Sequence, residues 1–596
     1  MDTTAFDKGY RMFADWETAR PDNFFTYDPN LQRTLEFYDG AKKYRAYVPR
    51  LYKFGSKVAT EMDRAVRISN DRKNLPTLRR YNEHGTRIED VDYHPTYHEA
   101  GRLVYESGAM AVYEEYGNNT LAMALLYLSS QNGEAGHNCP LACTAGVIKA
   151  LQKIGLHDAQ RERGEAYLMK LLDPNYDTNF TGAQYLSEVQ GGSDVGANGT
   201  VATPTDEPGV WRLNGLKWFC SNVSADLAMV TARVPEQGDG TRGLGLFLVP
   251  RHLDDGSING QYIQRLKEKV GTASLATAEV EFRDAVAYQV GETARGIQNV
   301  MLNVINTSRI YNATFTAGMA RRAYVEAWTY AQHRRAFGEA IISYPLVQDV
   351  LAKMHTDSTA LASGVFHITK LVDDIESGKD DADTLAIVRT ATNLNKYRSA
   401  VVAHEVITHG IELFGGNGAI EDFSVLPRLL RDNLVCENWE GPHNVLMAQV
   451  QRDFRRYAHH LPFIERVRNM FSGLTMRELK TEGLKACEQI TEELDAILAL
   501  PELEASVYFR PLMNRLTDLF YTGCMAVEGS WENAIKQDRT KQRIAEFYFN
   551  RRVISKPLAH WKEYPTWVSK LSHDVRPRKI DWTNDRWDGM DDPIWE

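Results

Sequence analysis

The spacing of apolar residues changes character twice along the chain. Up to about residue 175, and again after residue 291, apolar positions recur at helical spacing, and Pro140–Ile154 is a clear case. Between these regions, short runs rich in β-branched and aromatic residues are separated by Gly, Asp and Asn, which is typical of strands and turns. The predicted strands are Gly182–Ser187, Val210–Trp218, Leu227–Val234, Leu244–Val249 and Thr277–Phe282. The pattern therefore predicts an α+β protein with a β-barrel or sandwich between helical regions.

Four domains follow from this pattern. We predict an N-terminal helical domain over 1–175, a β-domain over 176–291, a helical bundle over 292–456 and an additional helical domain over 457–596. The polar stretch Leu75–Val91 is interpreted as a connection between helices. Long segments with few helix breakers support the bundle, because each can bury one apolar stripe. These segments are Val325–Arg334, Val347–Val372 and Thr384–Leu413. The last domain is predicted to be helical up to about Ser555 and to end in an irregular tail rich in Trp, Pro and Asp.

The composition narrows the class of protein. A chain of 596 residues is long enough for several domains, and 43% hydrophobic with 25% charged residues is ordinary for a globular protein. The sequence has no run of 18 or more apolar residues, so we expect no membrane span. A net charge of -10 disfavours non-specific attraction to nucleic acid or anionic lipid.

The cysteines and the chain ends suggest an intracellular protein. None of the 6 cysteines forms a CxxC pair, and no secretory signal precedes them, so reduced thiols are the simpler interpretation. The first residues are rich in Asp and Glu, unlike an Arg-rich transit peptide, and the final Pro-Ile-Trp-Glu is not a peroxisomal signal. We expect a cytoplasmic location, with a mitochondrial one left open.

A short signature in the C-terminal half of the chain indicates a catalytic site. The turn Gly415–Gly418 is followed by Arg431-Asp432 and then by Trp439-Glu440-Gly441. This order resembles the flavin-dependent acyl-CoA dehydrogenases, and the resemblance covers roughly residues 75–450. It implies an N-terminal helical domain, a middle β-barrel and a C-terminal four-helix bundle. It also implies that the protein binds FAD and acts on an acyl-CoA.

The resemblance implies that Glu440 is the catalytic base. In the family this glutamate removes the proton beside the thioester carbonyl, and the β-hydride leaves to flavin N5, giving a trans-2-enoyl-CoA. Burial raises the pKa of a carboxyl group toward the value that this task needs. Arg309 matches a family arginine beside the active site. The alternative is a structural Glu440 paired with Arg309, because most buried acids are paired.

Two segments of the predicted β-domain match the family's cofactor-binding motifs. The loop Ser187–Val195 resembles Thr-Glu-Pro-x-x-Gly-Ser-Asp, with Val189 in place of Pro, and Asn214–Asn222 resembles the strand whose hydroxyl contacts flavin N5. The residues that this resemblance assigns to FAD are Leu186, Ser187, Gly192, Ser193, Phe219 and Ser221. Taken alone, each segment is also compatible with an ordinary hairpin.

Further cofactor residues belong, by resemblance, to a neighbouring subunit. The family's Arg-x-x-Phe-Gly reaches the FAD diphosphate and adenosine, and a guanidinium suits phosphate. The matching residues and those of the glycine turn are Arg334, Phe337, Glu412, Gly415 and Gly416. Relatives often carry Gln at position 412. A basic helix end and a glycine C-cap are the structural alternatives. The match implies a homo-oligomer, and many relatives are tetramers.

One position near the base departs from the family. Pro442 stands where many relatives carry Thr, which removes a hydroxyl that contacts the flavin. Asn444, two residues later, is the candidate that replaces this contact.

Apparent metal motifs carry little weight. His404 and His409 are five residues apart, whereas the HExxH zinc motif needs a spacing of four. Cys139 and Cys143 share a helix face but have no matching histidine pair, so buried thiols are expected. We predict no metal site.

Several segments resemble the AidB-like branch of the family, including Tyr81–Pro95 and Cys139-Pro140-Leu141. That branch has an extended C-terminal helical domain; its first member is known for a bacterial response to DNA alkylation, and its animal relatives are associated with fatty acyl handling. The bacterial type binds DNA through basic C-terminal helices. Residues 451–596 contain 23 Lys+Arg and 23 Asp+Glu, and this balance argues against DNA binding.

Three functions compete. The leading hypothesis is an FAD-dependent acyl-CoA dehydrogenase that passes electrons to an electron-transferring flavoprotein. The alternative is an AidB-like flavoprotein that binds a fatty acyl ligand or DNA in a protective role with little turnover. A third is a flavin oxidase acting on a small carbon acid such as a nitroalkane, but relatives of that type use Asp as the base, and Glu440 argues against it.

Overall fold

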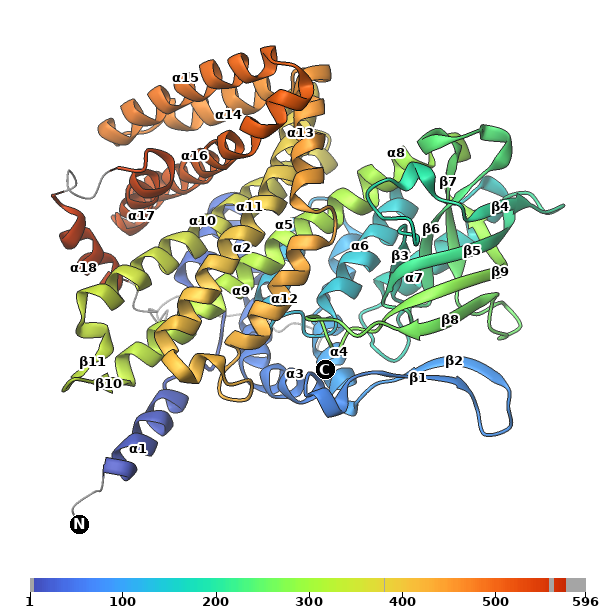
Figure 1. Cartoon of the computed structure of the whole chain (residues 1–596), viewed down its shortest axis with the longest axis horizontal. Coiled ribbons are helices and arrows are strands. Elements are labelled where there is room, and N and C mark those ends of the chain that lie inside the picture. The colour runs from blue at the N-terminus through green and yellow to red at the C-terminus, as the bar shows by residue number, and fades with distance from the viewer. Residues whose placement is uncertain (1–4, 380, 557–561, 575–596) are drawn as a thin grey trace.

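The computed structural model describes residues 5–379, 381–556 and 562–574. Helices come first, a β-domain follows, and long helices make up the rest, with a further layer of helices at the C-terminal end (Figure 1). This is the predicted α+β architecture with its additional helical extension. The β-domain lies at one side of the molecule and the long helices at the other (Figure 1).

The N-terminal part is mostly helical. Its helices are α1 (Ala5–Thr18), α2 (Pro29–Lys57), α3 (Asp63–Ser69), α4 (Pro95–Tyr105), α5 (Asn119–Ser129), α6 (Asn138–Lys153) and α7 (Arg161–Leu172). Helix α6 is buried along most of its length and packs against β3 of the β-domain and against α9 of the helical bundle. It thereby forms a wall between the two regions.

A two-stranded hairpin replaces the connection predicted over Leu75–Val91. Strands β1 (Thr77–Tyr81) and β2 (Arg87–Asp92) pair antiparallel. The Asn82 side chain closes the turn by accepting hydrogen bonds from the backbone N–H groups of His84 and Thr86 at 3.0 and 2.9 Å. The sequence did not reveal these strands because β1 has no buried residue and therefore lacks a clear apolar alternation.

The β-domain is a seven-stranded sheet. Its strands are β3 (Gly182–Tyr185), β4 (Val201–Pro204), β5 (Val210–Ser221), β6 (Leu227–Arg233), β7 (Leu244–Pro250), β8 (Gln261–Leu266) and β9 (Thr277–Gln289). The order is β3-β6-β4-β5-β9-β7, with β8 on β9, and an additional pairing of β6 with β7 closes the sheet into a barrel. Strands β4 and β8 escaped prediction because they are short and partly exposed.

The register of the sheet brings two predicted motifs together. Ser221, the last residue of β5, lies opposite Thr277, the first residue of β9. The N–H of Trp218 on β5 donates to the carbonyl of Ser187, just after β3, at 2.9 Å. The loop after β3 and the end of β5 therefore share one edge of the barrel.

The helical bundle follows the β-domain. Its elements are α8 (Gly296–Val300), α9 (Asn306–His333), the short strands β10 (Arg335–Ala336) and β11 (Glu339–Ala340), α10 (Pro345–Glu376), α11 (Ala382–Phe414), α12 (Leu426–Asn438) and α13 (His443–Tyr457). Helix α9 packs against α10, α11 and α5, and nearly all of its residues from Thr307 to Ala331 are buried. It begins well before the predicted Val325 because its first turns bury Thr, Ser, Asn and Arg, which show no apolar stripe.

The C-terminal extension packs on α10 and α11. It contains α14 (His460–Ser472), α15 (Arg477–Ala499), α16 (Glu502–Lys536), α17 (Thr540–Tyr548) and α18 (Tyr564–Asp574). A buried ion pair joins Arg398 of α11 to Asp518 of α16 at 2.7 Å. Helix α18 lies within the predicted irregular tail; residues 557–561 and 575–596 of that tail lie outside the described residues. None of the helices in the described ranges is long and apolar enough to cross a membrane.

Candidate active site

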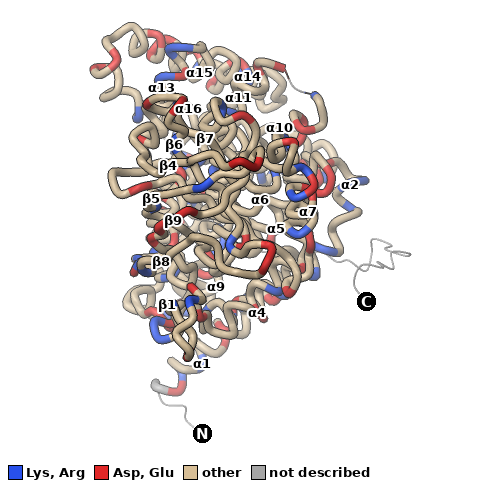
Figure 2. The backbone as a smooth tube through the Cα atoms, turned by 90° about the vertical axis from the view of Figure 1, so that its right-hand side faces the viewer, with Lys and Arg blue, Asp and Glu red and all other residues tan. Residues whose placement is uncertain are grey.

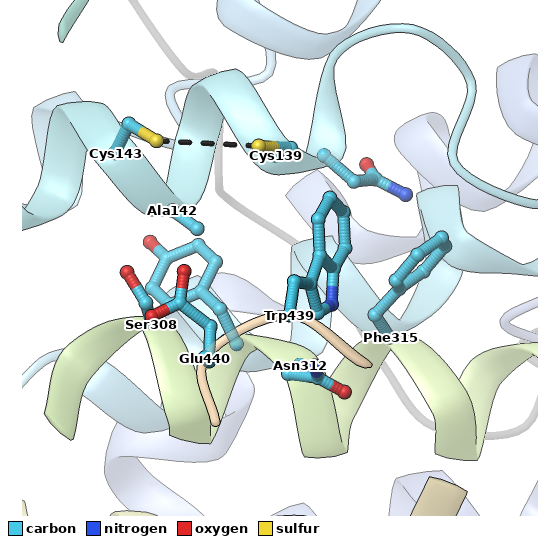
Figure 3. A pocket seen from close by; sticks show the side chains of 10 residues that line it. Cys139, Ala142, Cys143, Ser308, Asn312, Phe315, Trp439 and Glu440 are labelled. Carbon is cyan, nitrogen blue, oxygen red and sulfur yellow. Dashed lines mark hydrogen bonds between the residues drawn. The ribbon is translucent and has the colours of Figure 1, made fainter. Parts of the chain in front are cut away.

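Glu440 lies in a turn where its backbone has a left-handed conformation. Helix α12 ends at Asn438, and α13 begins at His443. Between them Glu440 has a φ of 57° and Gly441 a φ of 107°. A left-handed backbone is unfavourable for a residue with a side chain and is often found at functional sites. Here it turns the Glu440 carboxyl group toward helix α6 instead of along a continued helix (Figure 3).

The carboxyl group borders a small cavity between α6 and α9. Helix α6 contributes Cys139, Ala142 and Cys143 to its wall, and α9 contributes Ser308, Tyr311 and Phe315. Trp439 stands beside Glu440 and lines the same space (Figure 3). The wall is mostly apolar or aromatic, which suits a hydrocarbon ligand. The two thiols lie 4.0 Å apart, and contact with Cys143 and burial raise the pKa of Cys139.

Gln184 holds the carboxyl group. Its Nε2 donates to Glu440 Oε1 at 2.7 Å, and it also lies 3.3 Å from the Ser308 hydroxyl. Burial raises the pKa of Glu440 to about 7, although the nearby cations Arg309 and Lys396 and the Gln184 hydrogen bond all favour the ionised form. Near neutral pH this carboxyl group is therefore partly ionised and partly protonated, as a general base requires.

Arg309 binds the backbone of the turn, not the carboxylate. Its Nε donates to the carbonyl of Glu440 at 3.0 Å, and its Nη1 donates to Asn393 at 2.6 Å. Over the described ranges, no ion pair joins Arg309 to the Glu440 carboxylate. The geometry differs in this respect from a structural Glu–Arg pair, and it leaves the carboxylate facing the cavity.

Lys396 is a site residue that the sequence did not single out. It lies in α11, is fully buried and donates to the carbonyls of Gly441 and Glu437 at 2.9 and 3.3 Å. Burial lowers its pKa to about 8. One lysine in the long helical segment Thr384–Leu413 gives no signal of its own. Its role becomes visible only in the structure, where it supports the turn that carries Glu440.

The cofactor residues predicted in the β-domain come together. Leu186 and Ser187 follow β3, Gly192 and Ser193 lie in the next loop, and Phe219 and Ser221 end β5. The Phe219 ring is 54% exposed, and Ser221 is half-buried. A side chain at Gly192 would collide with the Ser187 hydroxyl, because its Cβ would lie 2.3 Å from that oxygen. The loop after β3 and the end of β5 thus form a surface on which one aromatic ring is exposed.

A buried ion pair supports this surface. Lys217 Nζ, fully buried, lies 2.7 Å from Glu188 Oε1. The carboxylate also accepts from the backbone N–H groups of Gly199 and Thr200 at 2.7 and 3.1 Å. Although burial opposes ionisation, Lys217 and these hydrogen bonds lower the pKa of Glu188 to about 2. The pair fixes both ends of the loop that carries Gly192.

The remaining predicted cofactor residues form a second group. Arg334 and Phe337 lie at β10, and Phe337 is 98% exposed. Tyr330 and Phe414 stack with ring centroids 4.0 Å apart and so join the last turns of α9, just before this hairpin, to the end of α11, where the glycine turn of Gly415 and Gly416 begins. Figure 1 places β10 and β11 at the opposite side of the molecule from the barrel. One chain therefore does not bring the two groups together.

Two further predicted residues are exposed. The Glu412 side chain is 76% exposed and lies 3.8 Å from His409. Asn444 lies in the first turn of α13, next to the Glu440 turn. His404 hydrogen-bonds Glu437 at 2.9 Å, and within the described part of the chain no group of three His, Cys, Asp or Glu residues is placed to hold a metal ion.

Comparison with known proteins matches successive parts of the chain to three domain families. Residues 16–178 match the adaptive response protein AidB N-terminal domain, 183–285 the acyl-CoA dehydrogenase middle domain and 294–454 the acyl-CoA dehydrogenase C-terminal domain. Acyl-CoA dehydrogenase family member 11 of Caenorhabditis elegans is 32% identical over 484 residues, which cover 79% of this chain and 77% of that protein. The chain belongs to the acyl-CoA dehydrogenase family.

Other members of the acyl-CoA dehydrogenase family support this assignment. AidB of Escherichia coli (strain K12) is 28% identical over 445 residues, covering 71% of this chain and 78% of AidB. The crystal structure of C. elegans ACDH-11 in complex with C11-CoA is similar with a TM-score of 0.82 and 27% identity, over 92% of this chain and 93% of that one. The predicted resemblance to the AidB-like branch is confirmed.

Proposed function

We propose that this member of the family is an FAD-dependent acyl-CoA dehydrogenase. The observation that carries the proposal is the Glu440 carboxyl group, which has a pKa raised to about 7 and borders an apolar cavity between α6 and α9. A base that removes a proton beside a thioester needs these two properties: partial ionisation near neutral pH and a dry surrounding.

The residues present fit FAD. The exposed Phe219 ring offers a stacking face, the Ser221 hydroxyl lies at the same strand end, and Gly192 lets the loop pack closely on the Ser187 hydroxyl. Bound there, FAD would supply the acceptor for the β-hydride of the substrate. Ser187, Ser193 and Leu186 on the adjoining loop complete the proposed contact surface.

The chain's own residues then account for the proton transfer. The acyl chain would occupy the cavity lined by Ala142, Tyr311 and Phe315, and Glu440 would take the α-proton. Gln184 would hold the carboxylate in place. Arg309 and Lys396 would hold the backbone of the turn, so that the carboxylate keeps one position. The product would be a trans-2-enoyl-CoA.

We further propose that FAD is shared between copies of the chain. The two separated groups of predicted cofactor residues support this, because Phe337, Gly415 and Gly416 are exposed, and Arg334 is half-buried, at the far side from their own barrel (Figure 1). A tetramer, with electrons passed to an electron-transferring flavoprotein, is the arrangement that the family resemblance favours.

An anaerobic titration with acyl-CoA thioesters of graded chain length tests the function. We expect the purified protein to be yellow and at least one thioester to bleach the flavin band near 450 nm. If none bleaches it although fatty acyl ligands bind tightly, the alternative of a binding flavoprotein with little turnover is favoured.

DNA is the less favoured ligand for that role. Residues 451–596 carry no net charge, and Figure 2 shows acidic and basic residues mixed along the chain.

A further inference from the structure

A lysine reaches the proposed flavin surface from the loop between β8 and β9. Lys269 Nζ donates to the carbonyl of Leu275 at 2.8 Å and to the hydroxyl of Thr277 at 2.9 Å. Thr277 is buried, and its hydroxyl lies 3.0 Å from that of Ser221. The two hydroxyls face each other because Ser221 and Thr277 are paired across β5 and β9. An ammonium group and two hydroxyls therefore form a continuous chain that ends at the proposed cofactor surface.

The chemistry of the three groups sets the direction of their hydrogen bonds. An ammonium group only donates, so the Thr277 oxygen accepts from Lys269. Thr277 then has a single proton of its own, and in the described part of the chain Ser221 is the acceptor that its hydroxyl contacts. Ser221 accepts this bond, and its own proton is left to point away from Thr277. Ser221 is thus set as a donor.

The surroundings keep this lysine in place. Burial lowers the pKa of Lys269, and the nearby Glu134 opposes that change where it is ionised, although burial raises the pKa of Glu134 itself to about 8. Glu134 is itself fixed, because it accepts from the backbone N–H groups of Gly136 and Cys139 at 2.6 and 3.0 Å. Lys269 therefore has two fixed acceptors beside the Glu134 carboxyl group, and its ammonium group has little freedom to turn away from Thr277.

We propose that Lys269 is a positioning residue which, through Thr277, orients the Ser221 hydroxyl to donate toward the flavin atom that accepts hydride. The inference rests on the proposed function, because it needs FAD on this surface. A fixed donor at an accepting nitrogen withdraws electron density from it and favours electron uptake. Lys269 would thus tune the cofactor without touching it or the substrate.

Two variants interrupt the hydrogen-bond chain at different residues, and a third is the matched control. Lys269→Met removes the ammonium group, Thr277→Val removes the central hydroxyl but keeps the charge of Lys269, and Thr277→Ser keeps the hydroxyl. The readouts are the absorption spectrum and midpoint potential of the bound flavin, measured by dye equilibration, and the rate of anaerobic bleaching. Dye equilibration needs no acyl-CoA, so it remains informative if the substrate is another compound.

Lys269→Met and Thr277→Val are expected to shift the flavin spectrum in the same way, to lower the potential and to slow bleaching about threefold to tenfold. Thr277→Ser should match the parent. The double variant should show no larger change in flavin potential or bleaching rate than the single variants, because both substitutions act on the same hydrogen-bond chain. Should Lys269→Met fail to fold, Thr277→Val against Thr277→Ser decides the question.

Failure of the proposed function and failure of the Lys269 inference give different results. A parent protein that takes up no FAD would overturn the proposed function and this inference with it. If the parent is a normal flavoprotein and Thr277→Val has its spectrum and potential, the hydrogen-bond chain plays no part, whereas the proposed function stands. Additive effects of the two substitutions would also overturn the inference, because they would show separate actions.

Discussion

At the scale of single residues, burial and three neighbouring side chains set the pKa of Glu440, the proposed base. Burial raises its pKa to about 7, while Gln184, Arg309 and Lys396 limit the rise. The two cations lie on the backbone side of the turn and do not neutralise the carboxylate by direct contact. The carboxylate therefore keeps a face toward the cavity without becoming permanently protonated.

Gln184→Met should move the pH dependence of flavin reduction upward. The Gln184 hydrogen bond stabilises ionised Glu440 and so lowers its pKa; without this bond the pKa rises above about 7. Because the base must be ionised, the pH of half-maximal bleaching rate should increase by roughly half to one pH unit. The measurement is the anaerobic bleaching rate between pH 6 and pH 9.

Ser308→Ala serves as the control for this substitution, since it alters a neighbour of Gln184 and leaves the bond to Glu440 in place. It should shift the profile much less. A profile that moves to lower pH in Gln184→Met would contradict the assignment of Gln184 as a donor to the ionised base.

The sequence predicted some of these residues and not others. Glu440 and Arg309 were named because short motifs contain them, although their roles stay predictions. Gln184 lies in a predicted strand without any motif, and Lys396 lies inside a long helix. Lys396 contacts carbonyls 41 and 45 positions away and Gln184 contacts a carboxylate 256 positions away, and spacing along the chain does not report such contacts.

At the scale of elements, the loop after β3 depends on one ion pair. Lys217→Met would leave the buried Glu188 carboxylate without its cation, at a cost of roughly 3–5 kcal/mol in the free energy of unfolding. We expect a lower melting temperature and loss of FAD, because the loop carries Ser187, Gly192 and Ser193. Thermal unfolding and the ratio of flavin to protein absorbance measure both effects.

Arg212→Met is the matched control for this variant. Arg212 lies on the same strand, β5, but is exposed, so its replacement should change stability by less than about 0.5 kcal/mol. If Lys217→Met unfolds like the Arg212 variant and retains its FAD, the ion pair does not support the loop.

Elements with a strong apolar pattern were predicted well, and those shaped by the surroundings were not. Helices α10 and α11 and strands β6 and β7 lie close to their predicted ranges, because their apolar spacing reflects burial. The hairpin β1–β2 was missed because its turn is closed by the Asn82 side chain and its strands are mostly polar.

At the scale of the whole molecule, the two groups of predicted cofactor residues lie far apart on one chain (Figure 1). The barrel edge with Ser221 and the hairpin with Arg334 face different sides of one chain (Figure 1). A ligand held by both groups would have to lie between copies. The additional helices α14–α18 form a further layer that packs on α10 and α11. The sequence predicted this layer only from the length of the segment and its helical spacing.

Arg334→Ala should therefore weaken FAD retention by about tenfold without altering Glu440 or its surroundings, because a charge-assisted bond to phosphate from the neighbouring copy is lost. Gel filtration with light scattering and flavin absorbance gives the assembly state and the FAD content together. Arg335→Ala, at the next position, is the control and should retain FAD. A monomeric parent with full FAD content would contradict sharing between copies.

The most direct test of the account is the rate of anaerobic flavin bleaching in Glu440→Gln with an acyl-CoA that bleaches the parent. The amide cannot accept the α-proton but fills the same space, so FAD content should be unchanged while the rate falls at least about 100-fold. A variant that holds FAD and bleaches at the parent rate would show that Glu440 is not the base.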